Sequence, residues 1–214
     1  MLGRALKGAL RAGGFKVRGL TRARCDVTDR RAVSRALDSF KPDVVVNSAA
    51  YTNVDLCEFE TRAARRVNGL APGLLAAACK RRGCVLVHVS TDSVFGDHAR
   101  GRRETDRPDP INAYGRSKAE GEKAVRAAGG DWYIVRTCCT DCTEAGAVAF
   151  NRGLYSEGAA RIKKKNWIFD LRLFERCLDR IVNLFSVDRK DPLRCLRIFL
   201  IDLKFIFSPS AVTE

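Results

Sequence analysis

The sequence predicts an α/β domain built on a doubly wound parallel sheet, with helices on both faces. Four times along the chain, a short apolar run alternates with a longer segment whose apolar residues recur at helical spacing. That is the pattern of strands alternating with helices. One run, residues 43–50 (DVVVNSAA), has consecutive valines instead of apolar and polar residues in alternation. Strands buried on both faces of a parallel sheet have this composition. We expect the domain to span residues 1–137.

The first residues resemble the second half of a nucleotide-binding motif. Gly3, followed by the apolar Leu6 and Leu10, matches the last glycine and the first helix of a GxxGxxG segment. Such glycines let the backbone approach a pyrophosphate, whose charge a helix N-terminus favours. We expect Gly3 to contact the cofactor, and we expect the first strand of the sheet and the first two glycines to be missing. Gly13 and Gly14 predict the end of this helix.

The next predicted strand, residues 15–20, leads into Thr21 and Arg22. At this place in dinucleotide-binding folds, an acidic side chain holds the ribose 2'-hydroxyl of NAD, whereas a basic one accommodates the 2'-phosphate of NADP. Arg22 therefore predicts NADP(H) as the cofactor.

The later elements follow from apolar periodicity and from the glycine, proline and capping residues at their ends. We expect helices at 29–40, about 55–82 and 112–128, and strands at 43–50, 84–90 and 132–137. Pro110 and Asn112 mark the start of the last helix, and Gly129 and Gly130 mark its end.

A tyrosine and a lysine four residues apart, Tyr114 and Lys118, lie near the start of that helix. Residues at this spacing share a helix face, and an ammonium beside a phenol favours the phenolate. Tyr114 could then donate a proton near neutral pH. A hydroxyl at the end of the preceding strand, Ser90 or Thr91, could hold a carbonyl oxygen during that transfer.

Five segments, in order, resemble the extended short-chain dehydrogenase/reductase superfamily. They are VNSAAYTNVDLCE, ARRVNGLAPGLLAAA, LVHVSTDSVF, ETDRPDPINAYGRSKAEGEKAV and VRT. Within the superfamily, the pattern is most similar to the dTDP-4-dehydrorhamnose reductase family, and the resemblance covers residues 1 to about 137. Five blocks in register are far more specific than a tyrosine and lysine at this spacing alone.

The resemblance implies NADPH-dependent reduction of a 4-keto sugar nucleotide by a Rossmann-like domain. The proton would come from Tyr114, Lys118 would orient the nicotinamide ribose, and Thr91 would hold the keto oxygen. Thr91 and Asp92 would contact the sugar substrate. The cofactor contacts that the family implies are Asp26, Val27, Ala50, Tyr51, Thr52, Tyr114 and Lys118.

Two departures from the family favour a different class of protein. Ser93 stands where the family usually has tyrosine, and Cys139 stands where it has tryptophan. With the missing glycines, they favour a non-catalytic cofactor-binding protein similar to the regulatory (beta) subunit of methionine adenosyltransferase. A stoichiometric partner, with no NADPH oxidation, would identify that alternative.

The composition limits the binding partners and the cellular location that we expect for the protein. The net charge of +14 is spread over helix faces and loops without interleaved aromatic residues, so we do not expect nucleic acid as a partner. Nine cysteines, an odd number, indicate reduced thiols and a cytoplasmic protein without a membrane span. Cys139 and Cys142 have no further ligands nearby, so we expect no metal. A homodimer or a partner enzyme is possible on this evidence.

Residues 138–214 lose the family resemblance. Leu171, Phe174 and Leu178 begin one helical pattern, and Leu193, Leu196, Leu200, Leu203 and Phe207 form another, which predicts a helical hairpin in place of a substrate domain. Such a tail, following a missing first strand, is also typical of an incomplete or misassembled reading frame.

A missing first strand would leave a gap in the centre of the sheet. Its two neighbours, residues 15–20 and 43–50, would then bury unpaired backbone groups. We expect residues 1–24 to be detached or poorly ordered, and NADPH affinity to be much weaker than in a full-length relative. The alternatives are collapse of the two neighbours onto each other, or insertion of residues 197–207 (RIFLIDLKFIF), which the charged Asp202 and Lys204 disfavour.

Overall fold

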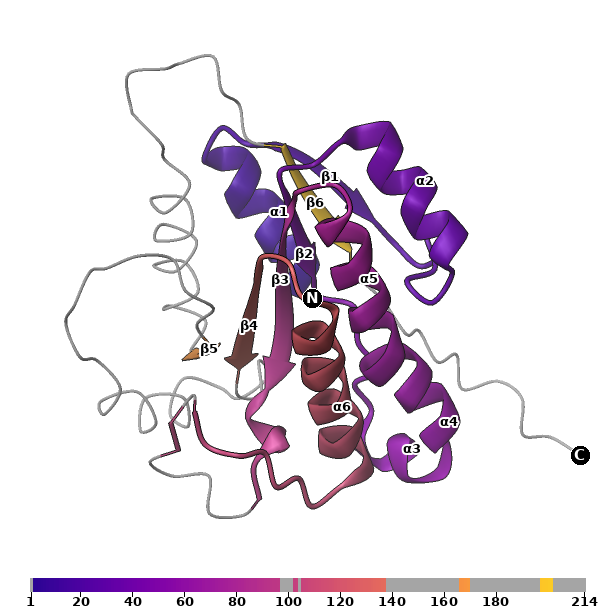
Figure 1. The fold of residues 1–214 in the computed structure, drawn as a ribbon, viewed down its shortest axis with the longest axis vertical. Helices are drawn as coiled ribbons and strands as arrows, with labels where there is room; N and C mark the ends of the chain where they lie inside the picture. Colours follow the sequence, from indigo (N-terminus) through magenta and orange to yellow (C-terminus); the bar gives the residue numbers. More distant parts are fainter. Residues whose placement is uncertain (1, 97–101, 104, 138–165, 170–196, 202–214) are drawn as a thin grey trace, which may run out of the picture.

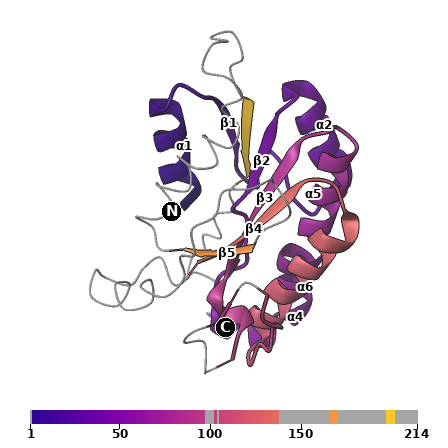
Figure 2. The same ribbon diagram turned by 60° about the vertical axis from the view of Figure 1, so that its left-hand side comes forward.

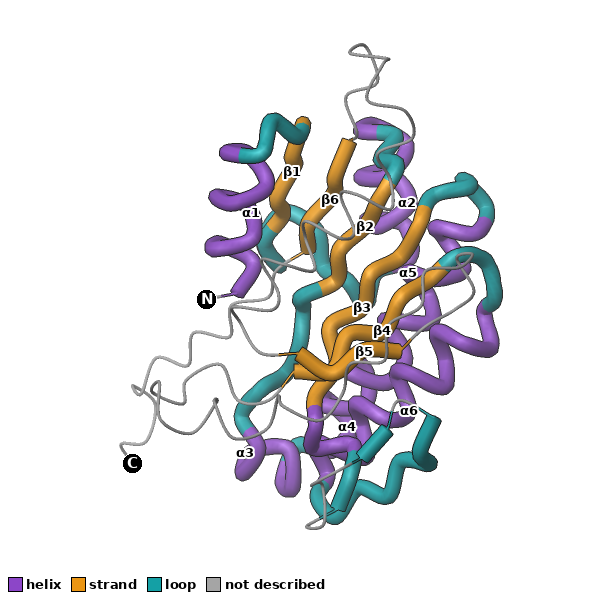
Figure 3. The backbone as a smooth tube through the Cα atoms, turned by 90° about the vertical axis from the view of Figure 1, so that its left-hand side faces the viewer, coloured by secondary structure: helices purple, strands orange, loops and turns teal. Residues whose placement is uncertain are grey.

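The fold is a six-stranded sheet between two layers of helices (Figures 1 and 2). The computed structural model describes residues 2–96, 102–103, 105–137, 166–169 and 197–201. All strand pairs in this sheet are parallel, and the strand order is β1-β6-β2-β3-β4-β5 (Figure 3). The predicted parallel α/β fold is confirmed.

The strands have the following bounds: β1 Lys16–Leu20, β2 Val44–Asn47, β3 Val85–Thr91, β4 Trp132–Thr137, β5 Asn166–Phe169 and β6 Arg197–Ile201. The helices are α1 Leu2–Ala12, α2 Arg30–Phe40, α3 Val54–Phe59, α4 Thr61–Ala64, α5 Ala71–Lys80 and α6 Ala113–Ala128. A π-helical turn, η1 Arg65–Leu70, joins α4 to α5, and a 3-10 turn, η2 Asp92–Val94, follows β3. Strand β5 was not predicted from the sequence.

Helix α1 covers one face of the sheet, and α2, α5 and α6 cover the other (Figure 2). Apolar side chains fill both layers: Leu6 and Leu10 of α1 pack on Val44 and Val46 of β2. On the opposite face, Leu37 of α2 and Leu75 of α5 belong to the larger cluster. Strand β2, buried at all four positions, therefore faces apolar side chains on both sides, as its run of valines predicts.

The helix predicted at about 55–82 is not continuous. At η1 the Ala71 N–H donates to Arg66 O, five residues back. Pro72 has no N–H to donate to Asn68 O, one turn earlier, so a regular α-helix cannot continue through this point. The wider π-helical turn η1 accommodates a residue without an N–H donor at this point.

The C-terminal segment corrects two predictions made from the sequence. Arg197–Ile201 is a strand, not part of a helix, and it lies between β1 and β2 in register with both. Residues 2–20 are not detached, because β1 pairs with β6 along its whole length and α1 packs on the same sheet. The remaining residues of the predicted helical hairpin lie outside the described part of the chain.

Two properties of β6 explain its insertion between β1 and β2: the hydrogen bonds that it makes and the residue at which it ends. A strand in this position pairs with backbone groups on both neighbours, which would otherwise be buried without partners. The strand ends at Ile201, whose side chain is 1% exposed in the core. The charged residues that argued against insertion come after this end, at 202 and 204.

The described residues bear on two further predictions, the state of the cysteines and the lack of a membrane span. Cys25, Cys57, Cys79 and Cys84 are buried free thiols, whereas Cys139 and Cys142 lie outside the described residues. None of the described helices has the length and apolar character needed to cross a membrane.

Candidate functional site

Polar residues gather where β3 ends and α6 begins. The site is built by the β3 end with η2, by the segment after β2, and by the first turns of α6. In a parallel sheet the carboxyl ends of the strands lie along one edge, which is where α/β folds bind ligands.

Two contacts fix the start of α6 against this edge. The side chain of Asn112 caps the helix by accepting a hydrogen bond from Gly115 N at 2.7 Å, as predicted. Ala113 N donates to Glu58 Oε1 of α3 at 2.6 Å. Gly115 itself touches the Ser93 carbonyl oxygen so closely that a Cβ atom would overlap it. Glycine at 115 thus lets α6 contact the turn after β3.

Lys118 is buried beneath this contact. Its side chain is 2% exposed, and Nζ donates a hydrogen bond to Val89 O of β3 at 2.7 Å. Burial lowers the pKa of this ammonium to about 8, although the nearby Glu122 carboxylate raises it. Tyr114 lies one turn before Lys118 and is partly exposed, so its helix face leads from solvent to the buried ammonium.

The two hydroxyls at the end of β3 have different partners. Ser90 Oγ donates to Glu122 Oε1 at 2.7 Å and is buried below the helix. Thr91 Oγ1 accepts from Ser93 N and lies 3.1 Å from both Asp92 Oδ1 and Ser93 Oγ. Thr91 therefore belongs to the turn at the sheet edge, whereas Ser90 belongs to a buried network.

That network joins β3, α6 and β4 and was not predicted from the sequence. Arg136 binds both carboxylate oxygens of Glu122, at 2.8 and 2.6 Å, and both side chains are almost completely buried. Burial alone would raise the pKa of Glu122, but the hydrogen bonds and charge of Arg136, helped by Ser90 and Arg126, lower it overall. A possible signal was the position of Glu122, four residues after Lys118 on the same helix face.

A second buried polar group joins β2 to β3. Asn47 Nδ2 lies 3.1 Å from His88 Nδ1, and His88 Nε2 has no hydrogen-bond partner among the described residues. Burial, and then the charge of Lys118, hold the pKa of His88 well below its usual value. His88 is therefore neutral at physiological pH.

Asn68, in η1, connects the segment after β2 to α6. Its side-chain amide exchanges hydrogen bonds with the backbone of Tyr51, at 2.8 and 3.0 Å, and donates to Ser117 Oγ at 3.0 Å. The Asn68 carbonyl oxygen lies against Gly121, where a Cβ would overlap it. Asn68 was also missed, because its role depends on the break in the helix.

The predicted cofactor contacts fall into two groups. Tyr51 is in one apolar cluster with Ala113, against which Tyr114 packs. Its hydroxyl donates to Glu60 Oε2 at 2.8 Å, and burial, with Glu60, raises its pKa to about 12. Ala50 is half-buried beside it, and Thr52 is exposed. The structure thus brings residues 50–52 close to Tyr114.

The second group lies at the β1 end of the sheet. Gly3 is buried in the first turn of α1, and Val27 is completely buried. Asp26 accepts hydrogen bonds from Thr28 N and Oγ1 at 2.8 Å and lies 3.7 Å from the exposed Arg22. Despite the opposing effect of burial, these contacts lower the pKa of Asp26.

A parallel sheet with helices on both faces, and a tyrosine and buried lysine one helical turn apart at its carboxyl edge, define a Rossmann-like domain of the short-chain dehydrogenase/reductase type. The chain belongs to the RmlD substrate binding domain family, whose model matches residues 1–140.

Sequence relatives agree with this assignment. The chain is 46% identical over 139 residues to a dTDP-4-dehydrorhamnose reductase of Mycolicibacterium smegmatis, covering 64% of this chain and 42% of the relative. It is 50% identical over 119 residues to the reductase of the same name from Burkholderia thailandensis, covering 55% of this chain and 40% of the relative. The chain therefore spans less than half the length of these relatives.

Solved structures show the same fold. The dTDP-4-dehydrorhamnose reductase of Bacillus anthracis, crystallised with NADP, matches with a TM-score of 0.62 and 34% identity, over 64% of this chain and 49% of that chain. The orthologue from Clostridium acetobutylicum matches with a TM-score of 0.60 and 39% identity, over the same fractions of the two chains.

Proposed function

We propose that this chain carries the cofactor-binding and proton-donating half of an NADPH-dependent reductase of 4-keto sugar nucleotides, as in dTDP-4-dehydrorhamnose reductase. The observation that carries the proposal is the buried Lys118 ammonium, bonded to the end of β3 and one turn from Tyr114 on α6. The relatives named above support this reading over a regulatory subunit, because their names are those of reductases.

The donors at this site fit a nicotinamide ribose. Among the described residues, Lys118 Nζ donates one hydrogen bond, to Val89 O, and an ammonium has three N–H donors. The two remaining donors suit the hydroxyls of a ribose. Ala50 and Thr52 would border the dinucleotide, and Gly3, Arg22, Asp26 and Val27 would hold its pyrophosphate and adenosine end. When bound, NADPH supplies the hydride.

The remaining chemistry belongs to side chains of the protein. Tyr114 donates a proton to the keto oxygen of the substrate, and the Lys118 charge stabilises the phenolate that remains. Thr91, held by Ser93 N, positions the same oxygen. Asp92 contacts the sugar. The substrate is a nucleotide sugar. We also propose that the protein acts in the cytoplasm, either as a homodimer or with a partner enzyme.

The test compares two tyrosine-to-phenylalanine variants of the 214-residue chain. With dTDP-4-dehydrorhamnose and NADPH, we expect Tyr114→Phe to lower kcat by at least about 100-fold, the low end for a positioned general acid. Tyr133→Phe is the matched control, because its hydroxyl is buried on β4 without a partner in the described structure. We expect it to leave kcat within about 2-fold.

Equal activity of the two variants would contradict the role of Tyr114. A wild-type chain that oxidises no NADPH with this substrate, yet binds a second protein stoichiometrically, would instead support the regulatory alternative.

A further inference from the structure

The turn between α5 and β3 brings two cysteines together. Hydrogen bonds close this turn from Gly83 N to Lys80 O at 3.3 Å and from Cys84 N to Cys79 O at 3.2 Å. Gly83 has a φ of 65°. These are the two bonds and the left-handed residue of a Schellman motif, whose first and last residues frequently contact each other. Here the first and last residues are Cys79 and Cys84.

The two sulfur atoms lie within reach of each other. Cys84 Sγ donates to Cys79 O at 3.6 Å, and the two thiols also share a hydrogen bond. A disulfide needs Cα atoms within about 7 Å and side chains that point towards one another. The backbone bond of the turn favours the first condition, and the contact between the thiols favours the second. Of the other cysteines that the structure describes, Cys57 donates to a backbone carbonyl, and Cys25 lies beside carboxylates.

The surroundings of the two thiols favour ionisation of Cys84. The hydrogen bond with Cys79 lowers the pKa of the Cys84 thiol, helped by the charge of Arg82 and opposed by burial. The same hydrogen bond, together with burial, raises the pKa of the Cys79 thiol. Because the thiolate is the nucleophile in cysteine chemistry, Cys84 is the sulfur that reacts first with an oxidant.

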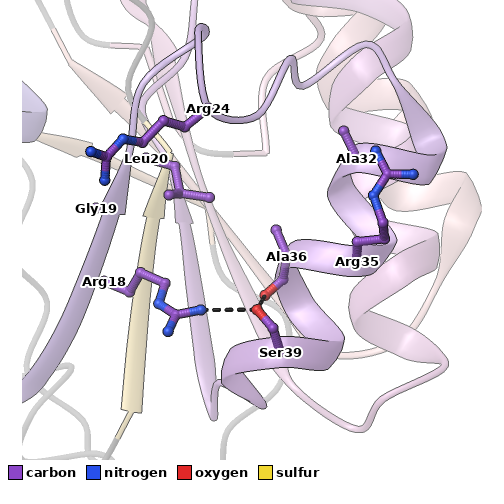
Figure 4. Close-up of a pocket in the computed structure, with 8 residues that line it drawn as sticks. All are labelled: Arg18, Gly19, Leu20, Arg24, Ala32, Arg35, Ala36 and Ser39. Carbon is purple, nitrogen blue, oxygen red and sulfur yellow. Dashed lines mark hydrogen bonds between the residues drawn. The ribbon is translucent and has the colours of Figure 1, made fainter.

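The turn that covers the thiols is open to solvent on its outer side. Both thiol side chains are buried, at 1% and 2% exposed, but Lys80, Arg81 and Gly83 are exposed. A Cβ at Gly83 would meet nothing within 4 Å. The pocket between β1 and α2 (Figure 4) has no cysteine in its lining. We therefore expect a small oxidant to reach the thiols by local opening of the turn.

We propose that Cys79 and Cys84 are a modification site at which a peroxide forms a reversible disulfide. The Cys84 thiolate attacks one oxygen of hydrogen peroxide, the O–O bond breaks, and the hydroxide that leaves takes up a proton to become water. The Cys79 sulfur then attacks the sulfenic acid on Cys84. The S–S bond forms, and the Cys79 proton leaves with the hydroxyl group as a second water. The two sulfurs thus give two electrons to one peroxide, and exchange with two glutathione thiols returns them.

The disulfide joins the end of α5 to the start of β3, at the opposite end of this strand from the Tyr114 site. Arg82 of the same turn binds Asp38 of α2 at 2.8 Å. Oxidation therefore fixes the turn that connects two helices with the sheet. The site does not depend on the reductase activity proposed above.

The first experiment measures the equilibrium between dithiol and disulfide in the 214-residue chain. The chain is held in buffers of reduced and oxidised glutathione, either native or in urea. Its free thiols are then blocked, and trypsin cuts at the basic residues of the turn. A disulfide between Cys79 and Cys84 links peptide 67–80 to peptide 83–100, and mass spectrometry measures the linked fraction.

We expect the equilibrium constant for the linked form to be at least about 10-fold greater in the native chain than in urea, because the folded turn holds the thiols together. A 10-fold ratio corresponds to about 1.4 kcal/mol of stabilisation by the disulfide. A native constant no greater than that in urea would overturn the proposal.

The second experiment uses hydrogen peroxide with dimedone, a reagent that adds to sulfenic acids. Cys79→Ala removes the second thiol, so we expect dimedone to label Cys84 at least about 10-fold more than in the unmodified sequence. Cys84→Ala should give neither the linked peptide nor a label on Cys79. The matched control is Cys25→Ala, at a thiol as buried as Cys84, which should leave the linked peptide unchanged.

Equal labelling of the remaining thiol in Cys79→Ala and Cys84→Ala would contradict the order of attack. Links from Cys79 or Cys84 to Cys25, as abundant as the link between the pair, would show unselective oxidation and overturn the proposal. Neither measurement uses turnover, so failure here leaves the Tyr114 test unaffected.

Discussion

Lys118 carries its charge in an environment that disfavours it. Burial separates the ammonium from water, and the nearby Glu122 carboxylate offsets only part of that effect. The folded-state pKa of Lys118, about 8, lies below the ordinary 10.5, so the folded protein releases this proton at a lower pH than the unfolded chain does.

This pKa predicts a pH dependence of the proposed reaction. Lys118 stabilises the Tyr114 phenolate only while it is protonated, so we expect kcat to fall as the pH rises through about 8. The measurement is kcat at saturating NADPH and sugar nucleotide from about pH 6.5 to 9.5. A profile that rises across pH 8 would contradict the assigned role of the ammonium.

In the buried pair of Glu122 and Arg136, by contrast with Lys118, each charge is stabilised by the other. Glu122→Gln leaves the Arg136 guanidinium buried without a carboxylate, which should lower the free energy of unfolding by about 3–5 kcal/mol. The matched control is Glu120→Gln on the same helix, whose pair with Arg65 is largely exposed. We expect a much smaller loss there, because solvent screens the pair. Urea denaturation of the two variants gives the comparison, and equal losses would refute it.

The lowered pKa of Glu122 also sets the direction of its acid sensitivity. A carboxylate whose folded-state pKa lies below its unfolded value stabilises the fold above the unfolded value of 4.5, and this contribution is lost as the pH falls.

At the scale of elements, the position of α6 depends on one glycine. Gly115→Ala places a methyl group on the Ser93 carbonyl oxygen, so α6 must move away from the end of β3. Overpacking of this kind typically costs about 1–3 kcal/mol. We expect thermal denaturation to show that loss.

Gly8 of α1 is the matched control, because a Cβ there meets nothing within 4 Å. Gly8→Ala in this exposed helix position should raise stability by about 0.5–1 kcal/mol. A stabilising Gly115→Ala would show that α6 does not press against η2.

The sequence predicted those elements whose pattern is local. The valines of β2, and Asn112 and Gly129 at the ends of α6, gave strand and helix bounds because burial and capping act within a few residues. The leucine spacing at 193, 196 and 200 predicted a helix instead of β6, because propensity and period carry no information about an open position between two distant strands.

In the candidate site, too, the sequence could suggest only those residues whose pattern is local. The sequence could suggest Tyr114 and Lys118 because four residues define a helix face. The Glu122–Arg136 pair joins a helix to a following strand without fixed spacing, and Asn68 depends on a turn that Pro72 interrupts. Glu122 shares a helix face with Lys118, but no sequence pattern pairs it with Arg136, and none marks the role of Asn68.

At the scale of the molecule, β6 connects the N-terminal unit to the rest of the sheet. It pairs with β1 on one side and β2 on the other, and its last carbonyl, Ile201 O, accepts hydrogen bonds from Ser48 N and Ser48 Oγ at 2.9 and 2.7 Å. Within the described residues, β1 has no other strand beside it.

This arrangement predicts the effect of shortening the chain. A chain that ends at residue 196 lacks β6, so the backbone amides of β1 should lose protection from hydrogen exchange while β3 and β4 keep theirs. A chain that ends at residue 201 retains β6 and is the control, in which β1 should stay protected. Protection of β1 in both chains would show that it pairs without β6.

Synthesis on the ribosome gives the β6 position a further consequence. Translation at about 5–20 residues per second needs roughly 9 to 35 s to proceed from the end of β1 to the start of β6. During that interval β1 and β2 are both made, yet the strand that separates them does not exist. The facing edges of two nascent strands are open to pairing with other chains. Closure of this sheet therefore waits until β6 has been synthesised, long after β1 and β2.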